Sequence, residues 1–386
     1  MYRILIAFLF APCVLMAQQP INYQSADSVT YQSYLLGDWE KLINYGEEAI
    51  RQDVDFKNLR KRMGYAYYVK NDYYAAVKQY EKALQFDKND MDIILYLYYC
   101  GLNIGDATIA NFYASKLTLD LQKSGGLKST KLLQSADVEL NYKMNDDSLD
   151  IRSNPTYYRF GIMSRLNYRF NLYQAFSQYT QTVNTTTATL QSEYYAGLNF
   201  TANAHNSFDI AYHYVGTKVD TSLFAGHLFF GKYTHKVGAL NYGVNTSLLI
   251  NLMGNYTQFG VFGGLTFGPK SNFYLNSSLS LVTDSVTTNF IFAQTLGARI
   301  AKPLWLEGNI TLGNLKNYND NNALYVYNSL DATVFRAGSS AFLNISKGIT
   351  LFANYTYDLK QLDDTFLNIK YNYNQHSISG GLIWKL

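Results

Sequence analysis

The sequence predicts an α+β multidomain protein, in which a helical tetratricopeptide solenoid is followed by an antiparallel transmembrane β-barrel. Three observations lead to this prediction: an export signal at the N-terminus, an evenly spaced helical repeat, and a long C-terminal series of alternating strands. They divide the chain into a signal peptide (residues 1–17), a repeat domain (18–130) and a barrel (131–386).

The N-terminus has the pattern of a secretory signal peptide. Arg3 precedes an apolar run from Ile4 to Met16, and the small residue Ala17 offers a cleavage point. A lipoprotein signal through Cys13 fits less well, because Pro12 precedes it and the apolar run continues beyond it. No later segment reaches the roughly 18 consecutive apolar residues of a membrane helix. The remaining destinations are the periplasm, the outer membrane and the exterior.

Charge is distributed unevenly along the chain. Residues 18–150 carry 15 basic and 19 acidic side chains, whereas residues 151–386 carry 16 and 10 and are crowded with Tyr, Asn, Thr, Ser and Gly. The formal net charge of +3 is too small to indicate nucleic-acid binding. Once the signal is removed only Cys100 remains, so an intramolecular disulfide is excluded.

Three similar tripeptides mark the helical repeat: GDW begins at Gly37, NDY at Asn71 and GDA at Gly105. They are evenly spaced, at the period of roughly 34 residues that tetratricopeptide repeats have, in which each unit is a pair of helices. The middle unit carries the small and aromatic positions of this pattern at Gly64, Tyr67, Tyr73, Ala76, Tyr80 and Ala83. The sequence therefore predicts three units, about the minimum that stacks stably.

Helical repeats either present a groove to a partner or act as a spacer for the next domain. Analogy with this architecture favours docking of a periplasmic or outer-membrane protein. The candidate partner-binding residues are Tyr67, Tyr68, Tyr73 and Tyr98.

After Ala136, apolar and polar residues alternate in segments of about ten residues. In the stretch ADVELNYKM, Val138, Leu140 and Tyr142 alternate with polar residues, as in a strand with one apolar face. A soluble sandwich would also alternate, with its apolar face inside. The export signal, the continuous hairpin series and the sparse charge favour a barrel whose apolar face meets lipid and whose polar face lines the lumen.

Short turns alternate with longer polar loops, which is typical of an outer-membrane barrel. Counting ADVELNYKM as the first strand and HSISGGLIWKL as the last gives about 14 strands, and starting at Tyr157 with the segments around 227–237 merged gives 12. An even number places both ends of the barrel at the periplasmic side. The sequence thus predicts a protein of the Gram-negative outer membrane, in contact with the lipid bilayer, with its N-terminal domain in the periplasm.

The combination of repeat units with a C-terminal barrel resembles the YaiO-like outer-membrane barrel family, in particular its versions in Bacteroidetes-type bacteria. The stretches that carry the resemblance are LYQAFSQYTQTV, EYYAGLNF, AYHYVG and the closing GGLIWKL. The resemblance covers most of the mature chain, and its motifs are aromatic patterns without a catalytic signature. It implies the architecture and says little about chemistry.

Alternation also predicts which side chains face the lumen. They are Arg159, Arg165, Gln174, Gln178, Glu193, Asp209, His213, Arg299, Trp305 and Glu307. Asp209, His213 and Glu193 share a predicted face and could serve acid–base chemistry. No nucleophile, base and orienting group occur together at a suitable spacing, so no catalytic residue is expected. The five His residues are scattered and no Cys/His cluster has ligand spacing, so neither a metal nor a cofactor is expected.

The leading functional hypothesis is an outer-membrane protein whose repeats recruit a protein partner and whose barrel exports or anchors envelope material such as a polysaccharide. The polar lumen and its aromatic residues suit a hydrated sugar polymer. The alternative is a non-conducting scaffold subunit of an outer-membrane complex. A barrel enzyme, such as a hydrolase or an acyl-modifying enzyme, is the least favoured hypothesis.

Overall fold

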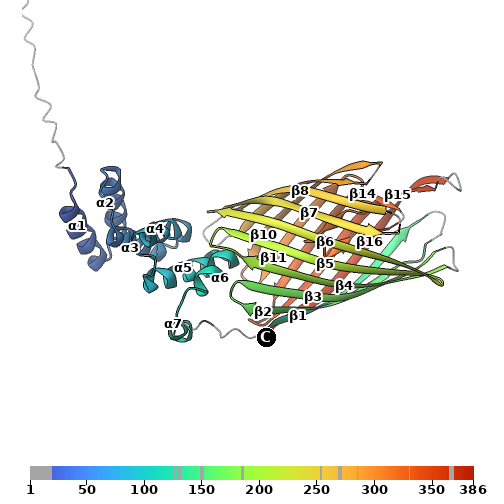
Figure 1. The fold of residues 1–386 in the computed structure, drawn as a ribbon, viewed down its shortest axis with the longest axis horizontal. Helices are drawn as coiled ribbons and strands as arrows, with labels where there is room; N and C mark the ends of the chain where they lie inside the picture. Colours follow the sequence, from blue (N-terminus) through green and yellow to red (C-terminus); the bar gives the residue numbers. More distant parts are fainter. Residues whose placement is uncertain are drawn as a thin grey trace, which may run out of the picture.

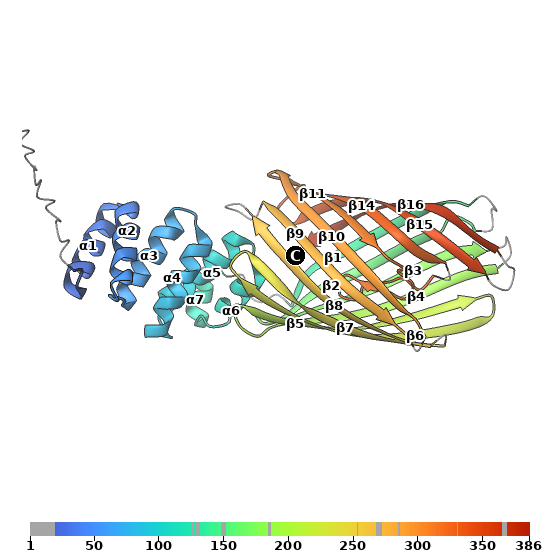
Figure 2. The ribbon, with the colours of Figure 1, turned by 90° about the horizontal axis from the view of Figure 1, so that it is seen from above.

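The computed structural model describes residues 20–124, 127, 132–147, 152–183, 187–252, 254–267, 272–284, 286–329, 331–364 and 369–386. The signal peptide expected at residues 1–17 lies outside these described residues. A row of helices leads to one end of a long barrel, and the C-terminus lies at that same end (Figures 1 and 2). We refer to this end as the helix-side end and to the opposite end as the far end.

The helices in the described part of the chain form pairs with a constant offset. They are α1 (Tyr23–Leu36), α2 (Trp39–Arg51), α3 (Lys57–Val69), α4 (Tyr73–Phe86), α5 (Met91–Ile104), α6 (Ala107–Ala114) and the short α7 (Leu119–Ser124). The first helices of the pairs begin at equal intervals, at Tyr23, Lys57 and Met91. The helix pairs therefore repeat with the spacing read from the sequence. Their assignment as tetratricopeptide units stays a prediction. Among the described residues, no helix is long and apolar enough to cross a membrane.

An aspartate begins the second helix of every pair. The side chain of Asp38 accepts a hydrogen bond from the backbone N–H of Lys41 at 3.1 Å, and that of Asp72 accepts one from Ala75 at 3.1 Å. Asp106 accepts bonds from Thr108 and Ile109 at 2.8 and 3.2 Å. Each carboxylate satisfies amide groups that a helix N-terminus leaves without a partner. The aspartate shared by GDW, NDY and GDA thus fixes where each of these helices starts.

Small residues allow the helices to approach closely. Gly64 in α3 lies against the ring of Tyr80 in α4, and Gly101 in α5 lies against the backbone of Ala110 in α6. Cys100 is fully buried in the same core, and burial raises the pKa of its thiol to about 12. Cys100 therefore behaves as a small apolar core residue.

The C-terminal part is one closed antiparallel barrel in which each strand pairs with its neighbours in the sequence and β1 pairs with β16. Its strands are β1 (Leu133–Asp146), β2 (Thr156–Asn167), β3 (Phe170–Val183), β4 (Thr187–Thr201), β5 (Asn206–Val219), β6 (Ser222–Val237), β7 (Leu240–Asn251), β8 (Gly254–Phe267), β9 (Phe273–Thr283), β10 (Thr288–Ala301), β11 (Leu304–Leu312), β14 (Ala332–Asn344), β15 (Ile349–Asp364) and β16 (Ile369–Lys385). The strand count is 14, as predicted, and the alternative of 12 is wrong because β6 is a complete strand paired on both edges. Two short strands, β12 (Asn319–Asp320) and β13 (Tyr325–Val326), form a separate hairpin.

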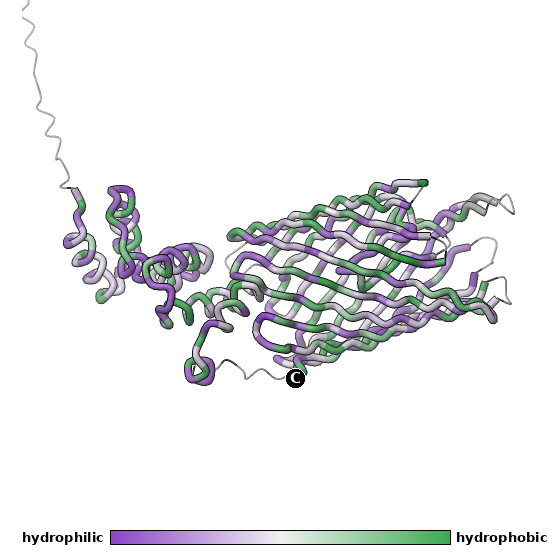
Figure 3. The backbone as a smooth tube through the Cα atoms, in the orientation of Figure 1, coloured by the Kyte–Doolittle hydropathy of each residue, from purple (hydrophilic) through white to green (hydrophobic). Residues whose placement is uncertain are grey.

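The first strand, β1, has its apolar face on the outside of the barrel and its polar face on the inside. Val138, Leu140 and Tyr142 point outward and remain 40, 64 and 47% exposed, whereas Glu139 and Lys143 line the interior. Hydrophobic and hydrophilic residues alternate in the same way along the other strands (Figure 3). A soluble sandwich is excluded, because one sheet closes on itself around a polar interior and leaves its apolar face outside.

Candidate functional site in the barrel lumen

The inner wall of the barrel encloses a cavity of about 1970 Å³. Amide and hydroxyl side chains make up much of its lining, including Asn245, Ser280, Thr295, Asn309 and Asn354. The lining reaches from Thr108 in helix α6 at one end to strand termini such as Val219 at the other. The interior is therefore a polar space that extends along the barrel.

The connection between β11 and β14, of which the structure describes residues 313–329 and 331, folds into this space. It contains the β12–β13 hairpin, and we call it the infolded loop. Asn321, Asn322 and Ala323 at its tip have positive φ angles of 50, 55 and 66°. Asparagine tolerates this left-handed conformation better than most residues, which explains how the run of asparagines makes the tight turn.

Hydrogen bonds fasten the infolded loop to the opposite wall. The carbonyl oxygen of Ala323 lies 2.8 Å from Nδ1 of His213 on β5, and the carbonyl of Asn322 accepts a bond from the Tyr195 hydroxyl at 3.0 Å. Gln258 on β8 accepts from the backbone N–H of Asn319 at 3.0 Å and donates to its carbonyl at 3.1 Å. Gln258 thus pairs with the loop backbone as a neighbouring strand would.

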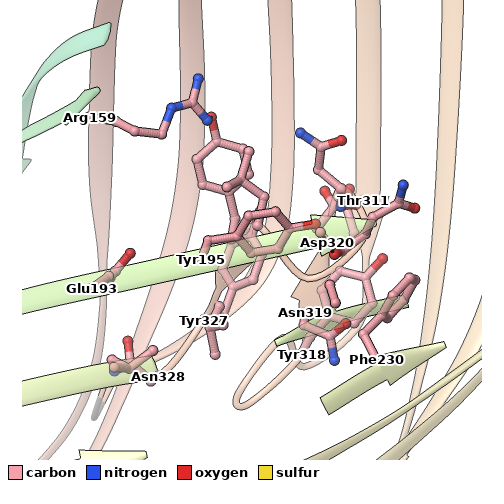
Figure 4. Close-up of a pocket in the computed structure, with 18 of the residues that line it drawn as sticks. Arg159, Glu193, Tyr195, Phe230, Thr311, Tyr318, Asn319, Asp320, Tyr327 and Asn328 are labelled. Atoms are coloured by element: carbon pink, nitrogen blue, oxygen red, sulfur yellow. Dashed lines mark hydrogen bonds between the residues drawn. The ribbon is translucent and has the colours of Figure 1, made fainter. Parts of the chain in front are cut away.

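Apolar contacts support these hydrogen bonds. Ala323 packs with Leu228, Phe230 and Leu249, and Leu324 packs with Ala175 and Tyr195. Nearer its entry, the loop buries Leu315 and Tyr318 against Val282 and Ile291. Figure 4 draws the loop residues Tyr327 and Asn328 together with Arg159, Glu193 and Tyr195 of the wall, all of which line this cavity. The infolded loop therefore crosses the lumen and narrows it.

Two clusters of paired charges border the loop. Nη2 of Arg159 lies 3.1 Å from Glu139 and 3.4 Å from Asp137, and Nη1 donates to the hydroxyl of Tyr325 at 2.9 Å. Towards the far end, Nε of Arg152 lies 2.6 Å from Asp331, the last residue of the loop. Because both groups are largely removed from water, their charges require these partners.

The predicted acid–base group is assembled only in part. His213 is 1% exposed, and its Nε2 lies 3.4 Å from Oε2 of Glu193. Asp209 accepts a bond from Asn199 at 2.8 Å instead of contacting His213. Because Nδ1 of His213 faces the carbonyl of Ala323, His213 lies between Glu193 and the infolded loop and contacts both.

The remaining residues predicted to face the lumen lie at different heights. Arg159, Glu193, Asp209 and Glu307 line the main cavity. Arg299 and Trp305 line a second cavity of about 580 Å³ at the helix-side end, with the guanidinium 5.8 Å from the indole centroid. Nε of Arg165 donates to Asn171, another residue of the main cavity, at 3.2 Å.

Gln174 and Gln178 were expected in the lumen, and the structure corrects this. They share the face of β3 that carries Phe176, which is 46% exposed on the outside. Gln174 accepts a bond from the Tyr194 hydroxyl at 2.7 Å, and Gln178 accepts one from the Tyr158 hydroxyl. Tyrosine hydroxyls on the outer face give these amides the partners that the lumen was expected to provide.

The tyrosines proposed for partner binding occupy different environments. Tyr67 is half-buried and donates to Glu47 at 2.7 Å. Tyr68 packs edge-on against Tyr73, which is buried and donates to Asn71. Tyr98 packs on the core that also holds Tyr168, a barrel residue between β2 and β3.

The helices also contact the turns of the barrel, which the sequence did not reveal. Nε2 of His205, in the β4–β5 turn, lies 3.0 Å from Glu81 in α4. Nζ of Lys236 on β6 lies 3.0 Å from Asp106, the residue that caps α6. Ala204 is buried in the helical core, so the contact is apolar as well as ionic. The end of the helical row thus packs on the helix-side mouth.

Among the described residues, no group of three or more His, Cys, Asp or Glu side chains is arranged to hold a metal ion. No protein-family model matches the chain, and no curated protein matches it. The YaiO-like resemblance therefore stays a prediction.

Solved barrel structures are similar to part of the chain. The CymD monoaromatic hydrocarbon channel is 8% identical, with a TM-score of 0.43 over 67% of this chain and 90% of that one. The Pseudomonas putida toluene transporter TodX is 7% identical, with a TM-score of 0.44 and the same coverages. A Pseudomonas aeruginosa FadL homologue is 7% identical, with a TM-score of 0.42 over 72 and 93%. Similarity at this level carries no argument about the substrate. The assignment of the fold as a barrel is based on the strand pairing of this chain alone.

Proposed function

We propose that this protein is an outer-membrane channel for hydrated polar solutes such as saccharides, with its helices on the periplasmic side. The observation that carries the proposal is that one closed sheet has an apolar outer face and a polar inner face. An apolar outer face suits acyl chains, closure leaves no strand edge unpaired in the bilayer, and the lumen offers hydrogen-bonding groups along its length.

The infolded loop bears on the size of the solute. It crosses the lumen and is held at both its tip and its sides, so it narrows the path available to a polymer. Export of a polysaccharide then requires an extended chain or a displaced loop. Passage of short saccharides requires neither change, and we favour it.

Reconstitution in planar lipid bilayers tests this function. We expect discrete conductance steps from the full chain, and larger steps when residues 314–330 are replaced by a short Gly-Ser link. The same link inserted between Asp220 and Thr221, in the tight β5–β6 turn, serves as the control and should leave the step size unchanged. A barrel that stays silent in both the wild type and the loop replacement would overturn the channel.

A non-conducting scaffold is the second candidate, and the firm anchoring of the infolded loop favours it. In that role the helices would recruit a protein partner and the barrel would only hold them at the membrane. Silent bilayers together with recovery of one partner in stoichiometric amount through the helices would support the scaffold. Conductance that increases on loop replacement would count against it.

A further inference from the structure

Most charged side chains around the main cavity have partners of opposite charge or strong hydrogen bonds. Arg159 is paired with Asp137 and Glu139, and Arg152 is paired with Asp331. These pairs offset the cost of holding charge away from bulk water. Cations without such a partner therefore stand out on this wall.

Lys143 on β1 and Lys360 on β15 are two such cations. Both line the cavity, and neither forms an ion pair with any residue that the structure describes. Lys360 is only 8% exposed. The ammonium of Lys143 has an aromatic neighbour, the ring of Tyr179 at 5.7 Å, which is a weak substitute for an anion.

The two lysines share one region of the wall with Arg336 on β14. Strand β16 separates β1 from β15, and β14 follows β15, so the three cations come from a continuous four-strand segment. Lys143 interacts electrostatically with Lys360 and Arg336, and also with the carboxylates of Asp358 and Glu193. Asp358 lies among the three cations, with its Oδ1 3.5 Å from Nε of Arg336, and Lys360 also interacts electrostatically with Asp331.

Asp358 pairs with Arg336 and Asp331 pairs with Arg152, so neither carboxylate forms an ion pair with Lys143 or Lys360, and these two ammonium groups leave positive charge at the cavity. A positive wall of this kind attracts anions and repels cations from the pore. A carboxylate could accept hydrogen bonds from both ammonium groups, which are strong donors to ionised oxygen. The surrounding hydroxyl and amide groups, such as Thr356, could meet the hydroxyls of a sugar ring.

We propose that Lys143, Lys360 and Arg336 form an anion-binding site in the lumen that favours acidic saccharides over neutral ones. The site deepens the proposed function and rests on it for the idea of passage, although binding itself does not require conduction. Asp358 limits the excess positive charge and so keeps the anion from being held too tightly to leave.

The test compares glucuronate with glucose, which share a ring and differ by one carboxylate. Calorimetry on the full chain in detergent should show binding of glucuronate and not of glucose. In bilayers, the wild type should prefer chloride over potassium in a salt gradient, and glucuronate should reduce the current. The double variant Lys143→Gln/Lys360→Gln should weaken glucuronate binding by about tenfold and lose the chloride preference.

Two further variants serve as controls for misfolding and for the loss of charge. Asp358→Asn removes the carboxylate that lies among the three cations and should tighten glucuronate binding, a gain that misfolding would not produce. Lys302→Gln/Lys347→Gln removes the same charge from exposed residues in helix-side turns and should bind as the wild type does. Equal affinity in all variants, or no glucuronate binding by the wild type, would overturn the site. Binding without any conductance would keep the site and overturn the channel.

Discussion

Gly46 and Gly101 both lie inside helices of the repeat, yet a methyl group added to each would meet different neighbours. At Gly101 in α5 the new carbon would lie 2.6 Å from the backbone nitrogen of Ala110 in α6, which cannot swing away. At Gly46 in α2 the nearest atom, at 2.7 Å, is the sulfur of Met63, near the flexible end of its side chain. Alanine substitutions at these two sites therefore distinguish the effect of close backbone approach from the effect of helix propensity.

We expect Gly101→Ala to lower the free energy of unfolding of the helices by about 1–3 kcal/mol, because overpacking outweighs the roughly 1 kcal/mol of helix propensity gained. Gly46→Ala gains the same propensity and should be neutral or stabilising. Urea unfolding of the full chain in detergent, followed by the helical signal in circular dichroism, measures both variants. Equal destabilisation of the two would contradict the close approach of α5 to α6.

For single residues, the sequence predicts on which face of a strand a side chain lies better than it predicts which residue will be its hydrogen-bond partner. Glu193 and Asp209 line the cavity because side chains alternate strictly along a strand and charge avoids lipid. Gln174 and Gln178 lie outside because a tyrosine hydroxyl on an adjacent strand can satisfy an uncharged amide there. Alternation is local in the chain, whereas the tyrosine partners come from neighbouring strands.

At the scale of elements, the helices and strands were predictable and the infolded loop was not. The capping aspartates and the alternation of strands act within a few residues, so they can be read directly. Residues 313–331 look like any polar loop, because a hydrated lumen and bulk water favour the same side chains. The available signal was the group Leu324, Tyr325, Val326 and Tyr327, which is too apolar for an exposed loop.

Gln258 gives a direct test of how the infolded loop is held. Gln258→Ala removes both hydrogen bonds to the backbone of Asn319 and leaves buried groups unsatisfied, at a cost of about 1–3 kcal/mol. We expect the loop to leave the wall more often, which would appear as increased noise in the open-channel current and as faster cleavage of the loop by added protease.

The matched control is Gln375→Ala on β16. Gln375 is as buried as Gln258 and also lines the cavity, but its hydrogen bond goes to Asn145 on β1 and not to the loop. Current noise and cleavage rate should stay at their wild-type values in this variant. If both variants changed these measurements equally, the effect would come from the wall and not from loop release.

At the scale of the whole molecule, the helices and the barrel are joined by contacts between residues far apart in the sequence. His205 meets Glu81 across 124 residues, and Lys236 meets Asp106 across 130. No local pattern reports such a pairing, which explains why the sequence predicted two separate domains. Because Ala107, Thr108 and Asn111 of α6 line the main cavity, the docked helices form part of its boundary at the helix-side end.

We expect the docking of the helices on the barrel to depend on pH through the protonation of His205. Nε2 lies 3.0 Å from Oε1 and 3.1 Å from Oε2 of Glu81, and Nδ1 lies 3.1 Å from the carbonyl oxygen of Lys236, so the doubly protonated ring can donate to both residues. The hydrogen bond to Glu81 raises the pKa of His205 above its ordinary value of about 6.5. A group with a raised pKa stabilises the docked state fully below its ordinary pKa and loses this contribution as the pH rises through the raised value.

We therefore expect the thermal midpoint of the helices to fall as the pH rises from below about 6.5 through the raised pKa of His205. His205→Gln should lower the midpoint at acidic pH and flatten this slope. Asp106→Asn keeps a side chain that can cap α6 and removes the ion pair with Lys236, so it should lower the midpoint and keep most of the slope, because Glu81 and not Asp106 is the largest cause of the raised pKa of His205. Circular dichroism of the full chain in detergent measures all three proteins. Because the ring of a second histidine, His235, has its centroid 6.4 Å from that of His205, the decisive quantity is the difference between wild type and His205→Gln. If that difference were constant with pH, protonation of His205 would not control docking. The His205–Glu81 pair would then contribute independently of pH, as the Lys236–Asp106 pair does.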